Sequence, residues 1–348
     1  MSLENVTISI IPESIQFLKM SDEEYFSDKY KDYISNSKLG LLNPEEGGSR
    51  EKFNSGFDQK YSPSFELGSA VHAMILQPEY YRIVDYKKPN GKLGVFAECV
   101  YKHRQNGLSI QEAIELASSE SDYYSGKLSE TRLRSAIKSS LPFYLARMKH
   151  ENKEGIEDLF LSETVNFKFE QCMKNVTPDM KNTLFPVGIF EDAEHFCEYA
   201  ILAEIDVEYD GIVTRVKVKG KLDNAVFDHE NEKIVLNDLK TTGKPVTFFM
   251  GNNVKVKDEN GRYLKTVWYD GSFQHFHYYR QMGMYLWLLC CYCKTKDIHY
   301  KYKANMVVIE TIPEFKSKIY PVSAAQIKKG LDEFKQLIVE LVKWKREK

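Results

Sequence analysis

Residues 218–242, VKGKLDNAVFDHENEKIVLNDLKTT, decide how this chain is expected to fold. Two apolar segments flank a polar turn from Asp228 to Lys233, a pattern that predicts two antiparallel strands joined in a hairpin. The simplest hairpin has its centre between Glu230 and Asn231. That register determines which side chains of the two strands face each other.

In this register, charged side chains gather on one face of the predicted hairpin. Asp223 lies directly opposite Asp238, with the two Cβ atoms about 5 Å apart. Lys240 follows Asp238 by two residues and points to the same face, to which Lys221 is also assigned. Two facing carboxylates repel each other unless a cation neutralises them, and oxygen ligands suit Mg²⁺. A lysine beside such a metal could stabilise charge on a reacting phosphate.

An exposed hairpin with ordinary surface charges would show the same residues, so the Asp-x-Lys spacing has two interpretations. The neighbouring residues favour the metal site. Val235, Leu236 and Leu239 predict that the second strand is largely buried. Charges in a buried strand need a partner or a metal, because their desolvation is costly.

The segments Lys219–Asp223 and Asn237–Thr242 resemble the PD-(D/E)xK nucleases. More closely, they resemble the phage and bacterial branch that includes exodeoxyribonuclease VIII (RecE), which is related to RecB-like and Cas4-like nucleases. The resemblance implies that Asp223 and Asp238 bind metal and that Lys240 is catalytic. Leu222 stands where the family letters place a proline, at a variable position.

The segment FELGSAVHAMILQP, residues 65–78, is similar to a Gly-x-Ala-x-His helix of the same branch. The resemblance implies that His72 is a further metal ligand. Gly68 lies four residues earlier on the same helical face and leaves room beside the imidazole. A partly buried histidine without a metal would give the same pattern.

Three further features complete the predicted site. Gln281 and Tyr285 share a helical face and resemble a Gln-x-x-x-Tyr motif that helps to position nucleic acid in RecB-like nucleases; a core helix is the alternative interpretation. Glu204 resembles an acidic position upstream of the first Asp, as a metal ligand or as a strand-edge charge. Lys219 and Lys221 belong to a basic stripe that is expected to contact the nucleic-acid backbone.

Periodicity predicts the other elements. A short helix is expected at 66–77, and helices are expected over 109–150, with a capping box from Ser109 to Glu112 and a kink or break at Pro142. Strands are expected at 199–209, 214–227, 234–240 and 302–310, long helices at 273–293 and 324–348, and a loop or ragged hairpin at 251–272. The order predicts a mixed α/β, restriction-endonuclease-like core whose central mixed sheet is flanked by helices. We expect one domain over 1–348, with a helical N-terminal part, a largely helical insertion at 82–197 and the catalytic core at 198–310.

Composition sets only broad limits. The chain has 348 residues and a net charge of −2, which neither supports nor excludes nucleic-acid binding. Six cysteines form no disulfide framework, and the N-terminus has no secretory pattern, so we expect a cytoplasmic protein that does not enter a membrane. Cys290, Cys291 and Cys293 crowd one helix end, which argues against an iron–sulfur cluster.

The expected function is a DNA exonuclease that depends on Mg²⁺ or Mn²⁺ and resects double-stranded ends for recombination or repair. An endonuclease or a single-strand-specific nuclease of the same fold is one alternative. A catalytically inactive module that binds DNA or a protein is another. By resemblance, a phage origin, a single-strand annealing recombinase as partner and a homo-oligomer are also expected.

Overall fold

The computed structural model describes residues 6–56, 62–121, 130–150, 155–186, 193–257, 259 and 262–347. The chain divides into two compact units. The first unit comprises Met1–Phe57, Val176–Glu310 and Lys316–Lys348, and the second comprises Asp58–Asn175 and Thr311–Phe315. The expected single domain with an insertion at 82–197 stays a prediction.

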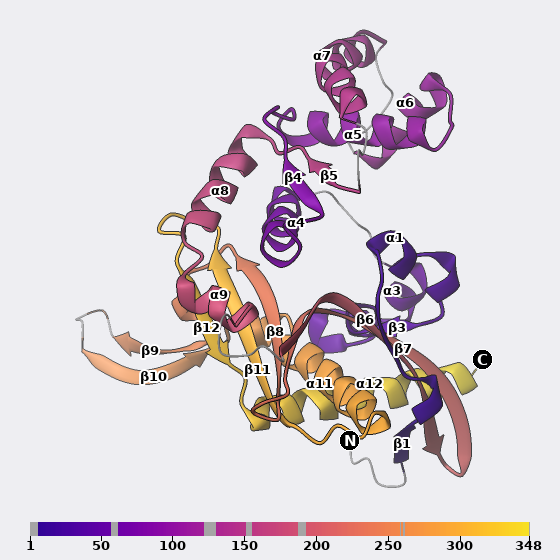
Figure 1. The fold of residues 1–348 in the computed structure, drawn as a ribbon, viewed down its shortest axis with the longest axis vertical. Helices are drawn as coiled ribbons and strands as arrows, with labels where there is room; N and C mark the ends of the chain where they lie inside the picture. The colour runs from indigo at the N-terminus through magenta and orange to yellow at the C-terminus, as the bar shows by residue number, and fades with distance from the viewer. Residues whose placement is uncertain are drawn as a thin grey trace. The chain divides into compact units, whose positions relative to one another are not determined.

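An eight-stranded mixed sheet forms the centre of the first unit (Figure 1). The long strands β6 (Ala193–Tyr209), β7 (Ile212–Asp228) and β8 (Lys233–Thr242) pair antiparallel in chain order. Strand β11 (Lys301–Glu310) then joins β8 in parallel, and β12 (Ser317–Pro321) pairs antiparallel with β11. The mixed α/β fold class is therefore confirmed.

The N-terminal residues contribute strands to this sheet as well as helices. Strands β1 (Val6–Ile10) and β2 (Gln16–Lys19) pair with β6, and β3 (Ile34–Ser35) pairs in parallel with β7. The short elements α1 (Asp22–Tyr25), α2 (Asn36–Gly40) and α3 (Arg50–Ser55) lie between and after them. The sequence predicts a helical N-terminal part, but this part also contributes three short strands to the sheet. Such short strands are defined by their partners, which lie far away in the sequence.

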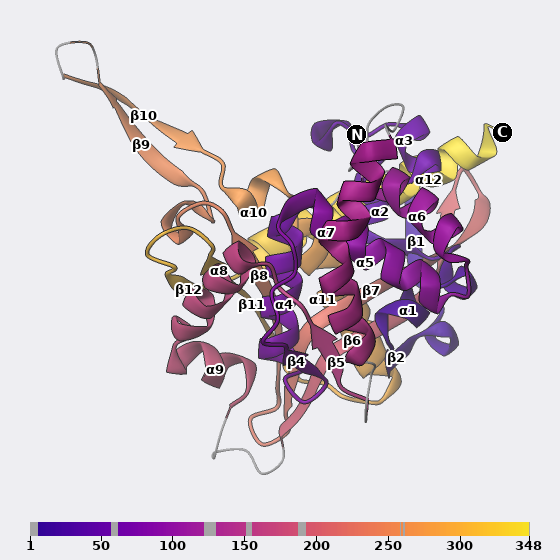
Figure 2. The same ribbon diagram turned by 90° about the horizontal axis from the view of Figure 1, so that it is seen from above.

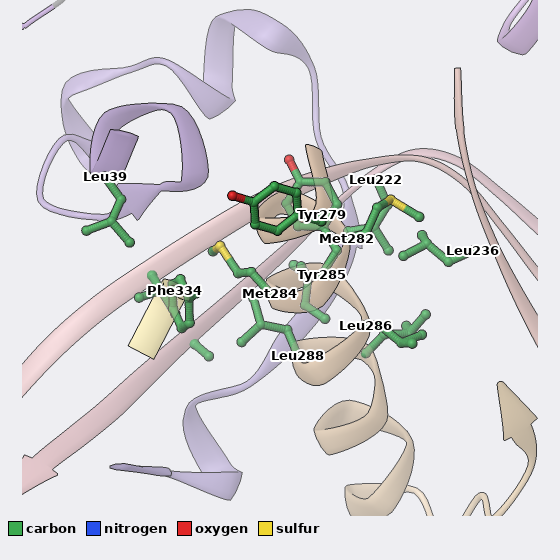
Figure 3. Close-up of a cluster of buried hydrophobic side chains, with 14 of the residues drawn as sticks. Leu39, Leu222, Leu236, Tyr279, Met282, Met284, Tyr285, Leu286, Leu288 and Phe334 are labelled. Atoms are coloured by element: carbon green, nitrogen blue, oxygen red, sulfur yellow. The ribbon is translucent and has the colours of Figure 1, made fainter. Parts of the chain in front are cut away.

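Two long helices, α11 (Tyr278–Thr295) and α12 (Ala324–Arg346), pack against each other and against the sheet. Gly283 and Gly330 lie at their crossing, where a Cβ atom on Gly283 would stand 2.4 Å from the Leu331 nitrogen. Figure 3 shows α11 side chains such as Met282 and Tyr285 in the core that also holds Leu222 and Leu236. This packing fixes the face of α11 that meets β7 and β8.

The predicted continuous helix over 273–293 is wrong, since α10 (Ser272–His275) ends before α11 begins. His277 lies between them with a left-handed φ of 49°. Its Nδ1 atom is 2.7 Å from Glu333 Oε1 and 2.7 Å from the Tyr279 hydroxyl. These buried contacts hold a backbone conformation that is uncommon outside glycine.

A buried polar cluster continues from this break. Arg280 is 1% exposed. Its Nε donates to Asn36 Oδ1 at 2.9 Å, and its Nη1 lies 2.5 Å from Glu46 Oε2 and 2.8 Å from Glu333 Oε1. Although burial opposes ionisation, hydrogen bonds from His277 and Tyr279 and the Arg280 charge hold the pKa of Glu333 below its usual range. The cluster joins α2, α11 and α12.

The second unit is mostly helical. It contains α4 (Pro63–Leu76), α5 (Gly91–Gln105), α6 (Ile110–Glu120), α7 (Glu130–Lys149) and α8 (Glu163–Lys174), with a small parallel pair of strands, β4 (Tyr81–Ile83) and β5 (Glu157–Leu159). The capping box of Ser109 and Glu112 is confirmed. Helix α7 continues through Pro142, so there is no break at this residue, and the alternative of a kink stays a prediction. Residues 122–129 of the region predicted to be helical lie outside the described residues.

Among the described helices of both units, none has both the length and the apolar character that a membrane crossing requires. The final helix is expected from the sequence to reach Lys348, which also lies outside the described residues.

Candidate active site

The predicted register of the β7–β8 hairpin is confirmed. The two strands pair from Asn224 opposite Asn237 to Asp228 opposite Lys233. Ladder pairing ends at Asn224. At the next position, the Leu239 N–H donates to the Asp223 carboxylate Oδ2 at 2.7 Å. The Asp223 side chain therefore accepts a backbone hydrogen bond at the point where β7 and β8 separate.

Buried asparagines fix the sheet directly beside this point. Asn237 Nδ2 donates to Asn224 Oδ1 at 2.7 Å and to the Thr183 carbonyl at 3.0 Å. Asn305 Nδ2 in turn donates to Asn237 Oδ1 at 2.9 Å, and Asn224 Nδ2 donates to the Leu184 carbonyl at 3.1 Å. These side chains link three strands and the last carbonyls of α9 (Pro178–Leu184). They hold β7 and β8 in register where the acidic residues follow.

Asp238 is a buried carboxylate with 1% exposure. Its Oδ1 accepts a hydrogen bond from Gln281 Nε2 of α11 at 2.6 Å. Its Oδ2 lies 2.5 Å from Lys240 Nζ, but no donor among the described residues makes a well-aligned hydrogen bond to it. Burial raises the pKa of Asp238 to about 7, against the effect of the Lys240 ammonium, and the Asp223 carboxylate raises it further.

Lys240 lies between the two aspartates. Its Nζ is 2.5 Å from Asp238 Oδ2 and 3.6 Å from Asp223 Oδ2, and it stands 5.4 Å from the centre of the Tyr278 ring. Burial alone would lower the pKa of the Lys240 ammonium, but the carboxylates of Asp223 and Asp238 outweigh it and raise that pKa. The lysine therefore stays charged at neutral pH.

Glu198 is an acidic residue of the group that the sequence did not single out. On β6, Cys197 pairs with Asn224 and Tyr199 pairs with Leu222, so Glu198 is level with Asp223. A Glu198 carboxylate oxygen lies within 4.8 Å of one of Asp223. Burial raises the pKa of Glu198 to about 7, and the Asp223 charge adds to the effect. Its backbone is left-handed, with φ 57°.

A signal for Glu198 is present in the sequence. The β6–β7 turn is Asp210-Gly211, a dipeptide that favours the two-residue hairpin turn with positive φ at both positions. The structure shows φ values of 51° and 70° there and pairs Tyr209 with Ile212. Counting back from this turn sets Glu198 opposite Asp223.

Glu204 is not brought to this group. On β6, Glu204 pairs with Lys217 of β7, and its carboxylate lies 3.6 Å from Arg215. Six residues of strand separate it from Glu198, a distance of about 20 Å at the usual rise per residue.

Among the residues predicted to bind nucleic acid, only Gln281 touches a carboxylate of the two aspartates. Lys221 Nζ lies 2.9 Å from Glu198 and 2.5 Å from Asp22. Lys219 is buried and donates to the Tyr25 carbonyl at 2.6 Å. Tyr285 is also buried, and its ring lies against Gly220, where a Cβ atom would meet Tyr285 Cε1 at 2.5 Å. The geometry gives Lys219 and Tyr285 structural positions.

His72 belongs to α4 of the second unit, whereas the aspartates and Lys240 belong to the first. Its predicted role as a metal ligand stays a prediction.

Carboxylate oxygens of Glu198 and Asp223 lie within 4.8 Å of each other, close enough to share a cation. Glu198, Asp223 and Asp238 supply only oxygen ligands, which hard cations such as Mg²⁺ and Mn²⁺ prefer. When ionised, Glu198, Asp223, Asp238 and Asp22 carry four negative charges against the two positive charges of Lys221 and Lys240. Burial is the main cause of the raised pKa values of Glu198 and Asp238, and the Asp223 carboxylate adds to both. Asp238 Oδ2 is also buried and lies 2.5 Å from Lys240 Nζ.

Comparisons with known proteins define little beyond this geometry. No family model matches the sequence, and no curated protein matches it. Among solved structures, the chain is similar to the crystal structure of a protein from Eubacterium rectale described as a "Putative exonuclease". The two share 14% identity with a TM-score of 0.40, over 95% of this chain and 88% of that one.

Proposed function

We propose that the first unit is a metal-dependent nuclease whose active site contains Asp223, Asp238 and Lys240, together with Glu198. The observation that carries the proposal is the buried Asp238 carboxylate, which pairs with Lys240 where β7 and β8 separate, while the same lysine also lies 3.6 Å from Asp223. A hairpin with ordinary surface charges would not bury these groups.

The carboxylates of Glu198, Asp223 and Asp238 would hold Mg²⁺ or Mn²⁺. Bound there, the cation would act as a Lewis acid on a phosphodiester and on the attacking water. Whether His72 completes the ligand set is part of the proposal, and His72→Ala tests it through the affinity for Mn²⁺.

The chain's own residues divide the remaining work. Gln281 donates to Asp238 Oδ1 and fixes the orientation of that carboxylate. Lys240 stays protonated and provides an ammonium that can stabilise negative charge as it develops on the phosphate. The Tyr278 ring and the two aspartates hold that ammonium in place, so little reorganisation is needed during the reaction.

The proposed substrate is DNA, and the proposed mode is exonucleolytic removal of nucleotides from double-stranded ends. A duplex labelled at either end, incubated with Mg²⁺ or with EDTA, tests cleavage, metal dependence and polarity together. Closed circular and single-stranded DNA serve as the comparison substrates. Cleavage of closed circular DNA would indicate an endonuclease instead of an exonuclease. Faster cleavage of single-stranded DNA would identify single strands as the preferred substrate.

Matched variants test the site itself. Asp238→Asn and Lys240→Ala should each lower the cleavage rate by about 100-fold or more, because the first removes a proposed metal ligand and the second removes the ammonium that stabilises charge on the phosphate. Glu198→Gln should also impair cleavage, whereas Glu204→Gln on the same strand should not. Equal cleavage rates of the Glu198 and Glu204 variants would show that Glu198 is not part of the active site. Full activity of folded Asp238→Asn would refute the nuclease assignment.

A further inference from the structure

A separate two-stranded hairpin extends from the first unit. Strands β9 (Asn252–Lys257) and β10 (Tyr263–Tyr269) pair only with each other, and Figure 2 shows them reaching away from the main sheet. An isolated hairpin of this kind has little core of its own and is marginally stable in water. It nevertheless exposes large side chains: Val254, Tyr263, Leu264, Trp268 and Tyr269. Such exposure is typical of a binding surface.

One face of this hairpin combines aromatic rings with lysines. Thr266 pairs with Lys255 and Tyr263 pairs with Lys257, and residues opposite each other share a face. The Tyr263 hydroxyl is 3.0 Å from Thr266 Oγ1, which confirms that these two side chains are neighbours. Trp268, two residues after Thr266, lies on the same side. We call Lys255, Lys257, Tyr263 and Trp268 the arm face; Tyr263 is 60% exposed and Trp268 is 51% exposed.

The charge of the hairpin differs from that of the whole chain. Residues 252–269 contain more basic than acidic residues, although the protein has a net charge of −2. The acidic residues of this stretch, Asp258 and Glu259, are adjacent in the sequence. Lys255, Lys257 and Lys265 form no ion pair with any residue that the structure describes. Their charges are available to an anionic partner.

The base of the hairpin is joined to the residues that hold Lys240. Gly251 adopts φ 86° beneath the Trp268 ring, where a Cβ atom would stand 2.3 Å from Cζ2. Just before it, the Phe249 ring stacks on Tyr278 at 5.9 Å, and the Tyr278 ring is 5.4 Å from the Lys240 ammonium. The arm and the candidate active site therefore share a packed aromatic base.

We propose that the β9–β10 hairpin is an arm that binds single-stranded nucleic acid. Unpaired bases stack on Tyr263 and Trp268, while Lys255 and Lys257 contact the phosphates. Exposed rings favour a single strand because the bases of a duplex are already stacked on each other. The binding itself does not depend on cleavage. That the bound strand leads to Lys240 rests on the proposed nuclease function.

Binding is measured with the full-length protein in EDTA, so that cleavage cannot interfere. The probe is a fluorescein-labelled oligothymidylate of about 30 nucleotides, long enough for several binding sites of this kind. It is compared with a duplex of equal length, and fluorescence anisotropy gives the affinity. Tyr263→Ala should weaken binding by about 10-fold, the effect of losing one stacked base. Lys255→Glu should weaken it and flatten its salt dependence, whereas Lys265→Glu, on the opposite face, should have a smaller effect. Circular dichroism confirms that each variant is folded.

Three outcomes would refute the proposal that the hairpin binds single-stranded nucleic acid. They are no binding of oligothymidylate by the wild-type protein, wild-type affinity in both Tyr263→Ala and Lys255→Glu, or an equal loss of affinity in Lys255→Glu and Lys265→Glu. A change of oligomeric state in the arm-face variants, with unchanged DNA binding, would identify the arm as a contact between copies of this chain instead. If these variants lose DNA binding and the wild-type protein cleaves no DNA, the proposed binding role of the hairpin stands and only the proposed nuclease function is refuted.

Discussion

Replacing Asn237 with alanine should destabilise the first unit far more than replacing its neighbour Asn305. In the wild-type protein, Asn237 donates to Asn224 Oδ1 and to the Thr183 carbonyl and accepts from Asn305. The alanine variant leaves all three groups without that partner. Asn224 and Asn237 are both fully buried, so water cannot replace the bond between them.

The magnitude follows from these contacts. A buried acceptor left unsatisfied costs about 1–3 kcal/mol, and each half-buried hydrogen bond contributes about 0.5–1.5 kcal/mol. Asn237→Ala should therefore lower the free energy of unfolding by about 2–6 kcal/mol. Asn305→Ala loses one half-buried bond and should cost about 0.5–1.5 kcal/mol.

Urea denaturation followed by tryptophan fluorescence is a suitable assay. The three tryptophans, Trp268, Trp287 and Trp344, all lie in the first unit, so the signal follows that unit even if the second unfolds separately. A loss in Asn237→Ala no larger than that in Asn305→Ala would refute the reasoning, because it would mean that the buried asparagine bonds do not hold the strands.

Three further perturbations probe the packing around the site. Gly220→Ala should lower the free energy of unfolding by about 1–3 kcal/mol, because its Cβ would meet the Tyr285 ring at 2.5 Å. Urea titration should show a smaller loss when the same change is made in a Tyr285→Leu background. Strictly additive effects of the two changes would contradict the clash. Arg280→Met should lower the free energy of unfolding by about 3–5 kcal/mol in the same assay, because Glu46 and Glu333 lose their buried guanidinium partner. An unchanged denaturation midpoint would show that the pairs contribute nothing. Glu333 has a lowered pKa in the folded state, so its ionised form stabilises the protein above the unfolded pKa of about 4.3, and this contribution disappears as the pH falls through the folded value. The stability difference between wild type and Glu333→Gln should thus be present at pH values above about 6 and shrink on acidification; a difference that is constant with pH would show that ionised Glu333 is not the stabilising form.

Local patterns in the sequence predict much of the sheet. The polar turn between β7 and β8 sets their register, and the buried character of residues 234–239 indicates that Asp238 needs a partner. Both inferences depend on residues close together in the chain. The same stretch therefore suffices to place Asp223, Asp238 and Lys240 next to one another.

Other features depend on contacts between distant residues, which no local pattern shows. Strands β1 and β2 are defined by their pairing with β6, which lies far along the sequence. The break at His277 depends on Glu333, which belongs to another helix.

Glu198 is a different case, because its signal is local. The Asp210-Gly211 turn fixes the register of Glu198, but the family resemblance points to Glu204 instead. Only an alignment of the two strands from that turn distinguishes the two glutamates.

The way in which the first unit is assembled has a consequence for protein synthesis. Val6 pairs with Tyr209, so the first strand leaves the ribosome well before its partner has been made. At about 5–20 residues per second, that interval lasts about 10–40 s. Nearly all of the second unit emerges meanwhile. During this time the nascent β1 and β2 have no sheet to join, and their unpaired backbone is a natural target for chaperones.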